Sequence, residues 1–181
     1  MSIRSWRQPL EAALAGLAAG GQEGRPRVAV VGLGQELRGD DAAGCFVARR
    51  LQTDLSKDET RLVLEAGPAP ESQTGPLRKF RPALVIFVDA AQLGEAPGAV
   101  RWLPWEATAG TSNSTHGLPI EMTARYLSAM LGCQIFVIGI QPAEMTLGAA
   151  LTPAVQAAAD ELAAGLLAVL GDVGGQDEVA Q

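Results

Sequence analysis

Three uninterrupted apolar runs constrain the fold of this chain more than any other feature. They read VAVV at 28–31, LVIFV at 84–88 and IFVIGI at 135–140. A strand with one exposed face alternates apolar and polar residues, whereas a continuous apolar strand is buried on both faces. Because segments of helical composition separate these runs, we expect a mainly parallel sheet with helices on both faces. The sequence therefore predicts an α/β fold, a three-layer sandwich.

Strands and helices are expected to alternate from residue 27 onwards. We predict strands at 27–32, 61–67, 83–90 and 134–140, an edge strand at 99–103, and helices at about 41–55, 119–131 and 152–170. A stretch rich in Pro and Gly leads through 77–80, and a polar connection at 106–119 has the composition of a loop. Loops of this kind often carry function.

Length and composition indicate one compact domain. The chain has 181 residues, of which 48% are hydrophobic, and this suits one sizeable core better than two domains. We divide it into a helical extension and linker at 1–26, a main domain at 27–171 and a disordered tail at 172–181. Within the extension, residues 6–21 are rich in Ala and Leu at helical spacing.

Charge and hydropathy exclude several kinds of partner. The formal net charge is -6 and the Lys and Arg residues are scattered, so we expect no nucleic-acid partner. No apolar run approaches the roughly 20 residues of a membrane span, and the N-terminus lacks the pattern of a secretory signal. We therefore expect a cytoplasmic protein without membrane contact, and a monomer. Cys45 and Cys133 form no CxxC pair, so we interpret both as core residues.

The segment GLGQELRGDD at 32–41 could be either a phosphate-binding loop or the rim of an acidic site. A dinucleotide fingerprint needs GxGxxG, but Leu37 stands where the third glycine belongs and Gly39 comes two places late. Asp40 and Asp41 would repel a phosphate, and the GK[ST] of a Walker loop is missing. We expect no nucleotide cofactor, although a nucleotide-binding, Rossmann-like oxidoreductase remains an alternative on fold class.

Two acids and one histidine are candidates for a metal site. Asp41 follows the first strand after a loop, Asp89 ends the run LVIFVD, and His116 is the single histidine of the chain. Both acids should lie at one edge of the sheet if their strands are neighbours. Two carboxylates and an imidazole suit a divalent ion with open positions. The alternatives are helix capping by Asp40 or Asp41, a turn cap at Asp89 and a solvated loop histidine; for Asp40 we prefer capping.

Five short motifs then resemble one known family, in the order that the family shows. They are GLGQELRGDDAAG at 32–44, EAGPAPES at 65–72, VDAAQLGEAPG at 88–98, STHGLP at 114–119 and GIQP at 139–142. The segment from about 27 to 170 resembles the maturation endopeptidases of nickel-iron hydrogenases, and most of all the hydrogenase 3 branch. The resemblance implies a twisted five-stranded sheet. It also implies an enzyme that removes the C-terminal extension of a hydrogenase large-subunit precursor after nickel insertion.

The resemblance implies roles for the same three residues. The metal-binding positions of that family fall on Asp41, Asp89 and His116. By this resemblance, the three residues would recognise the nickel carried by the substrate and act in catalysis. We see no convincing Ser-His-Asp arrangement, and Cys45 has no evident base, so metal-assisted hydrolysis is the favoured mechanism. A weaker version is that nickel only positions the peptide. Asp40 and Glu65 are candidate helpers, although capping or hydrogen bonding is the role that we favour for each. A non-catalytic nickel chaperone is a further alternative.

Overall fold

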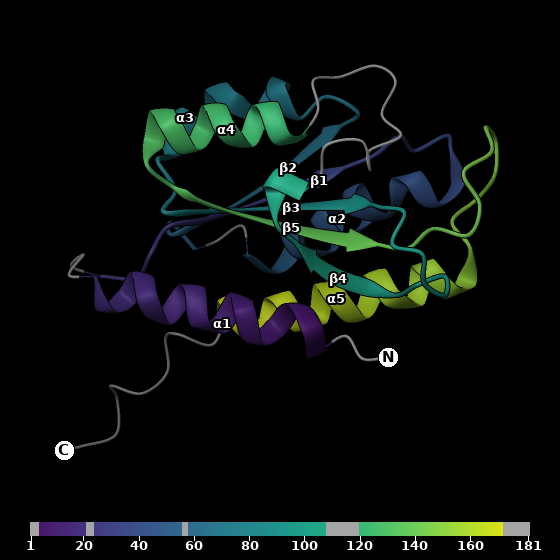
Figure 1. Ribbon diagram of the computed structural model, residues 1–181, viewed down its shortest axis with the longest axis horizontal. Helices are drawn as coiled ribbons and strands as arrows, with labels where there is room; N and C mark the ends of the chain where they lie inside the picture. Colours follow the sequence, from purple (N-terminus) through teal and green to yellow (C-terminus); the bar gives the residue numbers. More distant parts are fainter. Residues whose placement is uncertain (1–3, 21–23, 56–57, 108–119, 172–181) are drawn as a thin grey trace.

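The computed structural model describes residues 4–20, 24–55, 58–107 and 120–171 (Figure 1). Its helices are α1 (Arg4–Ala19), α2 (Ala43–Leu55), α3 (Thr74–Phe80), α4 (Ile120–Leu131) and α5 (Pro153–Gly171). Its strands are β1 (Val28–Leu33), β2 (Arg61–Gly67), β3 (Leu84–Ala90), β4 (Val100–Leu103) and β5 (Gln134–Ile140). Short 3-10 helices are η1 (Gly39–Ala42), η2 (Pro70–Gln73) and η3 (Trp105–Ala107).

The five strands form one mostly parallel sheet, as predicted. Their order is β2-β1-β3-β5-β4, and only the edge pair β4 and β5 is antiparallel. β1 pairs with β3 from Val28 opposite Leu84 to Gly32 opposite Val88. The chain leaves β1 on one side to form β2 and crosses to the other side to form β3, so the order reverses between β1 and β3. In open parallel sheets, ligands bind at the carboxyl ends of the strands at such a reversal.

Helices cover both faces of the sheet, which confirms the three layers. Figure 1 shows α3 and α4 on one side of the sheet and α1 and α5 on the other. α2 lies on the side of α5, because both helices contribute to the same buried cluster. Along β1, Val28 and Val30 point into that cluster while Ala29 and Val31 point into the opposite one. Burial on both faces is therefore the physical reason for the uninterrupted apolar runs.

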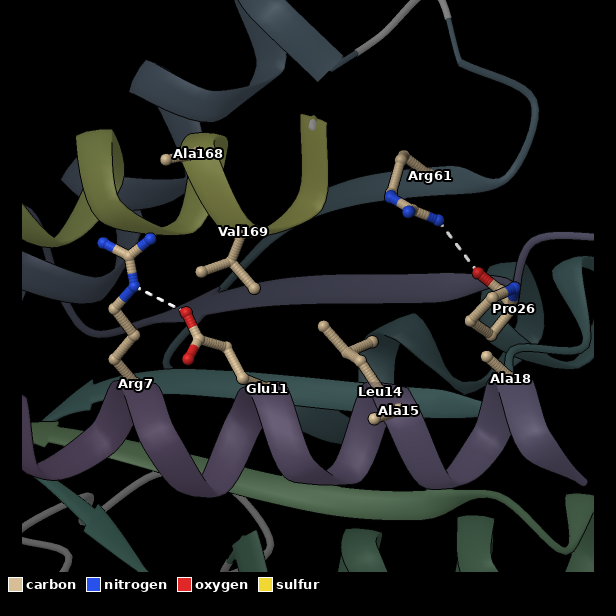
Figure 2. A pocket seen from close by; sticks show the side chains of 9 residues that line it. All are labelled: Arg7, Glu11, Leu14, Ala15, Ala18, Pro26, Arg61, Ala168 and Val169. Carbon is tan, nitrogen blue, oxygen red and sulfur yellow. Dashed lines mark hydrogen bonds and ion pairs between the residues drawn. The ribbon is translucent and has the colours of Figure 1, made fainter. Parts of the chain in front are cut away.

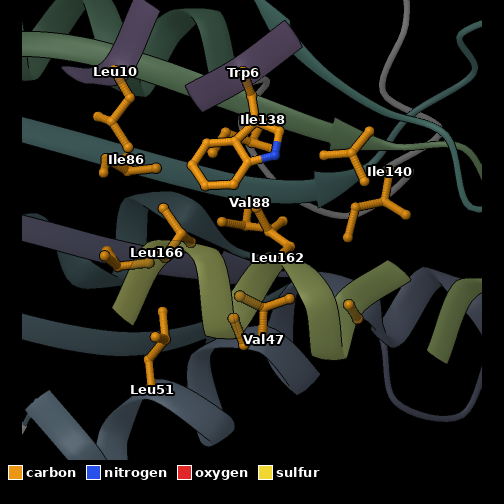
Figure 3. Packing of buried hydrophobic residues seen from close by; sticks show 14 of the residues in the cluster. Trp6, Leu10, Val47, Leu51, Ile86, Val88, Ile138, Ile140, Leu162 and Leu166 are labelled. Atoms are coloured by element: carbon orange, nitrogen blue, oxygen red, sulfur yellow. The ribbon is translucent and has the colours of Figure 1, made fainter. Parts of the chain in front are cut away.

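The N-terminal helix is packed into the larger core. Trp6 and Leu10 of α1 are 1% and 0% exposed, and Figure 3 shows both facing the strand residues Ile86 and Ile138. A Cβ atom added at Gly165 of α5 would lie 2.9 Å from Cζ2 of Trp6, so α5 provides a notch for the indole. The division of the chain at residue 27 stays a prediction, and the tail at 172–181 lies outside the described residues.

One helix was not expected from the sequence. α3 and the preceding η2 occupy the stretch rich in Pro and Gly, where we predicted no regular element. Pro70 begins η2 and Pro76 lies in the first turn of α3, and prolines are tolerated there because these N–H groups have no intrahelical partner. α3 ends at Arg81, which adopts the left-handed conformation with φ of 55°.

α5 also corrects the expectation about apolar runs. Its 19 residues are long and apolar enough to cross a membrane by length and composition alone. Burial in the protein core also explains why α5 is so apolar. Residues such as Val155, Leu162 and Leu166 are fully buried and pack in the same cluster as residues of the sheet and α2. A core helix meets the same criterion, so α5 gives only weak support for a membrane span.

Candidate active site

Close packing explains the glycines of the segment 32–44. Gly34 has a φ of 122°, and a Cβ atom there would lie 1.6 Å from the carbonyl oxygen of Asp41. A Cβ atom at Gly44 would lie 2.0 Å from the carbonyl oxygen of Val88, so only glycine lets the start of α2 approach the end of β3 so closely. These glycines bring the turn that carries Asp41 over the carboxyl end of β3. Their spacing needs no bound phosphate to explain it.

Asp41 lies in η1, at the carboxyl edge of the sheet. Its Oδ2 accepts a hydrogen bond of 2.9 Å from the backbone N–H of Gln35, which lies before the helix. Burial raises the pKa of Asp41 above its ordinary value, against the opposing effects of the Gln35 N–H and the charge of Arg38. Within the described part of the chain, Oδ1 accepts no hydrogen bond. One carboxylate oxygen is thus held in place by the backbone.

Asp89 lies at the end of β3, the neighbour of β1. Its Oδ1 accepts a hydrogen bond of 2.9 Å from the N–H of Ala90. Burial and then the negative charge of Asp41 raise the pKa of Asp89 to about 7, although the Ala90 hydrogen bond acts in the opposite direction. The two carboxylates therefore interact electrostatically at one edge of the sheet. This is the arrangement that the strand positions predicted.

The third candidate, His116, lies outside the described residues. Among the residues that are described, no group of three or more His, Cys, Asp or Glu side chains could hold a metal ion. The described structure therefore contributes two carboxylates to the candidate site. The connection that carries His116 begins after η3 and ends where α4 starts.

Asp40 does not cap a helix, so our preferred interpretation of it was wrong. Its side chain is fully buried. Its carboxylate accepts hydrogen bonds from the N–H groups of Ala143 (2.8 Å), Glu144 (2.9 Å) and Thr152 (2.7 Å), and from the Thr152 hydroxyl (3.0 Å). Hydrogen bonding, the other role that we favoured for Asp40, is the one seen here, and a role as a helper in catalysis stays a prediction. Asp40 fastens the loop between β5 and α5 to the loop that carries Asp41.

Glu65, the other candidate helper, is engaged by an arginine. Arg49 of α2 donates to both of its carboxylate oxygens, with Nε to Oε2 at 2.7 Å and Nη2 to Oε1 at 2.6 Å. Arg49 also forms an ion pair with Glu36 of the glycine loop. Bidentate pairing fixes both oxygens of Glu65. Its role here is to connect β2, α2 and the glycine loop.

Cys45 is a core residue, as expected. Its thiol is buried and lies 3.5 Å from the carbonyl oxygen of Gly34. Burial, and after it the negative charge of Glu65, raise the pKa of Cys45 to about 12, and the charges of Asp89 and Asp41 add to the effect. A thiol with so high a pKa is a poor nucleophile near neutral pH.

Gln141 organises the loop that follows Asp89, a role that the sequence did not predict. It is 6% exposed, and its Oε1 accepts a hydrogen bond of 2.7 Å from the N–H of Leu93. Its Nε2 donates to Oε1 of Gln92 at 3.1 Å and to the carbonyl of Pro142 at 3.0 Å. The motif GIQP was the available signal, because a polar residue directly after a buried strand needs hydrogen-bond partners.

A pocket between α1 and α5 lies at the other edge of the sheet (Figure 2). Its lining includes Pro26, which precedes β1, and Arg61, which begins β2. Arg61 donates to the carbonyl oxygens of Pro26 (2.9 Å) and Leu170 (3.0 Å). These groups lie at the amino ends of the strands, away from the two carboxylates. The pocket is therefore not part of the candidate site.

Comparison with known proteins identifies the family. The family model described as hydrogenase maturation protease (HycI) matches residues 45–169. The chain belongs to the hydrogenase maturation protease family. It is therefore a hydrolase, an endopeptidase of hydrogenase maturation, and the resemblance seen in the sequence is confirmed.

Individual relatives agree with this assignment. The hydrogenase 3 maturation protease of Escherichia coli K12 is 31% identical over 111 residues, which cover 61% of this chain and 69% of that protein. A putative hydrogenase maturation protease of Methanocaldococcus jannaschii is 28% identical over 122 residues, covering 64% and 72%. The crystal structure of the [NiFe] hydrogenase maturation protease HycI from Thermococcus kodakarensis has a TM-score of 0.77 and 34% identity, covering 91% of this chain and 99% of that one.

Proposed function

We propose that this endopeptidase removes the C-terminal extension of a nickel-iron hydrogenase large-subunit precursor after nickel insertion, and that Asp41, Asp89 and His116 recognise the nickel that the precursor carries. The observation that supports this most is the pair of carboxylates at the reversal of strand order. Each has one oxygen fixed by a backbone N–H group and one that accepts no hydrogen bond from the described residues.

The chemistry of these residues suits a divalent ion such as nickel. Carboxylate oxygens and a neutral imidazole are ligands for such ions, and three ligands leave positions open for the groups that the precursor contributes. Nickel belongs to the substrate in this proposal, so the enzyme engages a peptide only where a loaded site accompanies it. Recognition of the metal would thus couple cleavage to nickel insertion.

Hydrolysis needs an attacking water, a proton acceptor and a proton for the leaving amine. In the favoured version, nickel polarises the scissile carbonyl or activates the water, whose oxygen attacks the carbonyl carbon. One of the two carboxylates can take the proton of that water and return it to the amine when the C–N bond breaks. In the weaker version, nickel only positions the peptide, and the same carboxylate assists the water.

The test is to incubate the enzyme with large-subunit precursor that contains or lacks nickel, and to measure the mass of the precursor's C-terminus. We expect shortening only with nickel. Replacement of Asp41, Asp89 or His116 by alanine should abolish it while the circular dichroism spectrum stays unchanged. Asp54→Ala serves as the control, because this exposed acid lies near the end of α2 that is remote from the site.

Two results would contradict the proposal in different ways. Normal cleavage by His116→Ala would remove the histidine from the site. An unchanged precursor mass with wild-type enzyme would favour the nickel-chaperone alternative. The absence of a nucleotide cofactor is part of the proposal and is tested by thermal-shift titration with NAD or NADP, for which we expect no shift. The cytoplasmic location and the monomeric state also remain proposals.

A further inference from the structure

Two exposed leucines lie on neighbouring loops that are hydrogen-bonded to each other at the carboxyl edge of the sheet. Leu37, between β1 and η1, is 67% exposed, and Leu147, between β5 and α5, is 70% exposed. The N–H of Gly148 donates a hydrogen bond of 2.7 Å to the carbonyl of Leu37, so the two loop tips are in direct contact. We call Leu37 and Leu147 together the leucine ridge.

Hydrogen bonds fix the backbone of the two loops that carry the leucine ridge. The buried carboxylate of Asp40 binds the loop between β5 and α5 at both ends, near residue 143 and at Thr152. The N–H of Gly39 donates to the carbonyl of Ala149 at 3.1 Å, and Nε of Arg38 donates to the carbonyl of Met145 at 3.3 Å. A surface that is already ordered loses little conformational entropy when a partner binds.

The leucine ridge is tied to the candidate catalytic acid. Leu37 lies within the turn whose first N–H, from Gln35, holds the carboxylate of Asp41. The N–H of Arg38 donates to the carbonyl of Gln35 at 3.0 Å, and the N–H of Asp41 donates to the carbonyl of Arg38 at 3.2 Å. These bonds fix the position of Leu37 relative to Asp41. A polypeptide that reaches Asp41 therefore comes within reach of the ridge.

We propose that the leucine ridge binds a large apolar side chain of the substrate polypeptide close to the scissile bond. The inference rests on the proposed function, because the hydrogenase large-subunit precursor is the polypeptide it concerns. Isolated surface leucines are common and need no explanation. This pair differs because both leucines lie on hydrogen-bonded loops of fixed conformation, and one of these loops also carries Asp41 of the acidic site. Contacts of this kind select the substrate and need not change during the reaction.

The test uses Leu37→Ser, Leu147→Ser and the double variant with nickel-loaded precursor. We expect KM to rise about tenfold for each single variant and about a hundredfold for the double variant. The value of kcat should stay within about twofold, because a contact made equally in the ground and transition states affects only KM. Leu37→Met should restore a KM close to that of the wild type, because it keeps a large apolar side chain at the same place.

Met130→Ser is the matched control. Met130 is 55% exposed on α4, which covers the α3 face of the sheet, and it belongs to a second exposed apolar stripe with Met122 and Tyr126. We expect no change of KM in this variant. An equal rise of KM for Met130→Ser, or an unchanged KM in the double leucine variant, would overturn the proposal.

Direct binding separates this inference from the proposed function. Labelled precursor should bind the double variant about a hundredfold more weakly than the wild type, whether or not cleavage follows. Binding without cleavage by the wild type would contradict the proposed function alone, whereas equal binding by both proteins would contradict the ridge alone. Sedimentation of the free proteins adds one further outcome: a wild-type dimer that the serine substitutions dissociate would assign the ridge to contacts between copies, and would overturn the proposal.

Discussion

At the scale of single residues, Asp89 is an acid whose surroundings favour its neutral form. Burial and the neighbouring charge of Asp41 raise the pKa of Asp89 from 3.8 to about 7 in the folded chain. Between about pH 4 and pH 7, the native state therefore binds one more proton at this site than the unfolded state. The contribution of Asp89 to stability must fall as the pH rises through this window, and the full cost is present above pH 7.

We therefore expect Asp89→Asn to raise the free energy of unfolding by about 1–3 kcal/mol at pH 8 and to have little effect near pH 4. The amide oxygen can still accept the hydrogen bond from Ala90. Urea denaturation at both pH values measures the difference. Asp58→Asn is the control of opposite sign: burial alone would raise the pKa of Asp58, but hydrogen bonds from Thr60 and the charges of Arg61 and Arg25 outweigh it and lower the pKa. A less stable Asp89→Asn at pH 8 would show that the carboxylate is stabilised where it lies.

Asp40→Ala should lower the free energy of unfolding by about 3 kcal/mol, because several partly buried donors lose a charged, fully buried acceptor. The affected donors are the N–H groups of Ala143, Glu144 and Thr152 and the hydroxyl of Thr152. Glu144→Gln, an exposed change in the same loop, should stay within about 0.5 kcal/mol of the wild type. Equal urea midpoints for Asp40→Ala and the wild type would mean that water replaces the carboxylate without cost.

The sequence predicted the positions of Asp41 and Asp89 better than the role of Asp40. Asp41 and Asp89 each follow an apolar run, and the end of a parallel strand is a place that sequence alone can locate. The partners of Asp40 lie more than 100 positions away, as in its bond to Thr152 at a separation of 112. Local capping rules could not anticipate them.

At the scale of elements, α1 contributes two fully buried side chains, Trp6 and Leu10, to the larger core. Trp6 is 1% exposed and fits against the notch at Gly165. Trp6→Ala should lower the free energy of unfolding by about 3–5 kcal/mol, because it leaves a cavity between α1 and α5. Urea denaturation followed by circular dichroism measures the change.

Arg7→Ala is the control for α1. Arg7 is exposed and pairs with Glu11 at 2.7 Å on the surface of the helix, and such a pair contributes only about 0.3–0.5 kcal/mol. If Trp6→Ala and Arg7→Ala lowered the free energy of unfolding equally, surface contacts of α1 would stabilise its packing as much as the buried indole does. The helical periodicity of 6–21 predicted the element, but not its packing, because the notch belongs to α5 and becomes visible only in three dimensions.

α3 is a helix that the sequence pattern did not predict at all. Gly75 and Pro76 lie in the first turn of that helix, and there they do not interrupt hydrogen bonds. Read without the structure, the same residues indicate a loop. The short amphipathic segment after them is anchored by Leu77, which is fully buried under the sheet. Burial against the sheet stabilises this helix, and sequence composition does not reveal that burial. The apolar composition of the long strands, in contrast, was enough to predict them.

At the scale of the whole molecule, the order of the strands creates the candidate site. Alternation of strands and helices predicted a parallel three-layer sheet, but several strand orders satisfy that pattern. The order β2-β1-β3-β5-β4 makes β1 and β3 neighbours, and only this adjacency brings Asp41 near Asp89. The sequence alone could therefore say only that the two acids meet if β1 and β3 are neighbours. The strand order in the structure shows that they are neighbours.

The same sheet couples the two buried clusters, so we expect the described fold to unfold as one unit. Successive residues of β1 and β3 point alternately into the two clusters, and loss of either cluster exposes the backbone that supports the other. Trp6 reports on the cluster under α1 and α5, and Trp105 packs against the cluster under α3 and α4. Variants that keep only Trp6 or only Trp105, with phenylalanine at the other two tryptophans, should each show the same urea midpoint by fluorescence as by far-ultraviolet circular dichroism. An earlier fluorescence change in the Trp105 variant would mean that the layer of α3 and α4 separates first, and that the sheet does not bind both layers into a single cooperative unit.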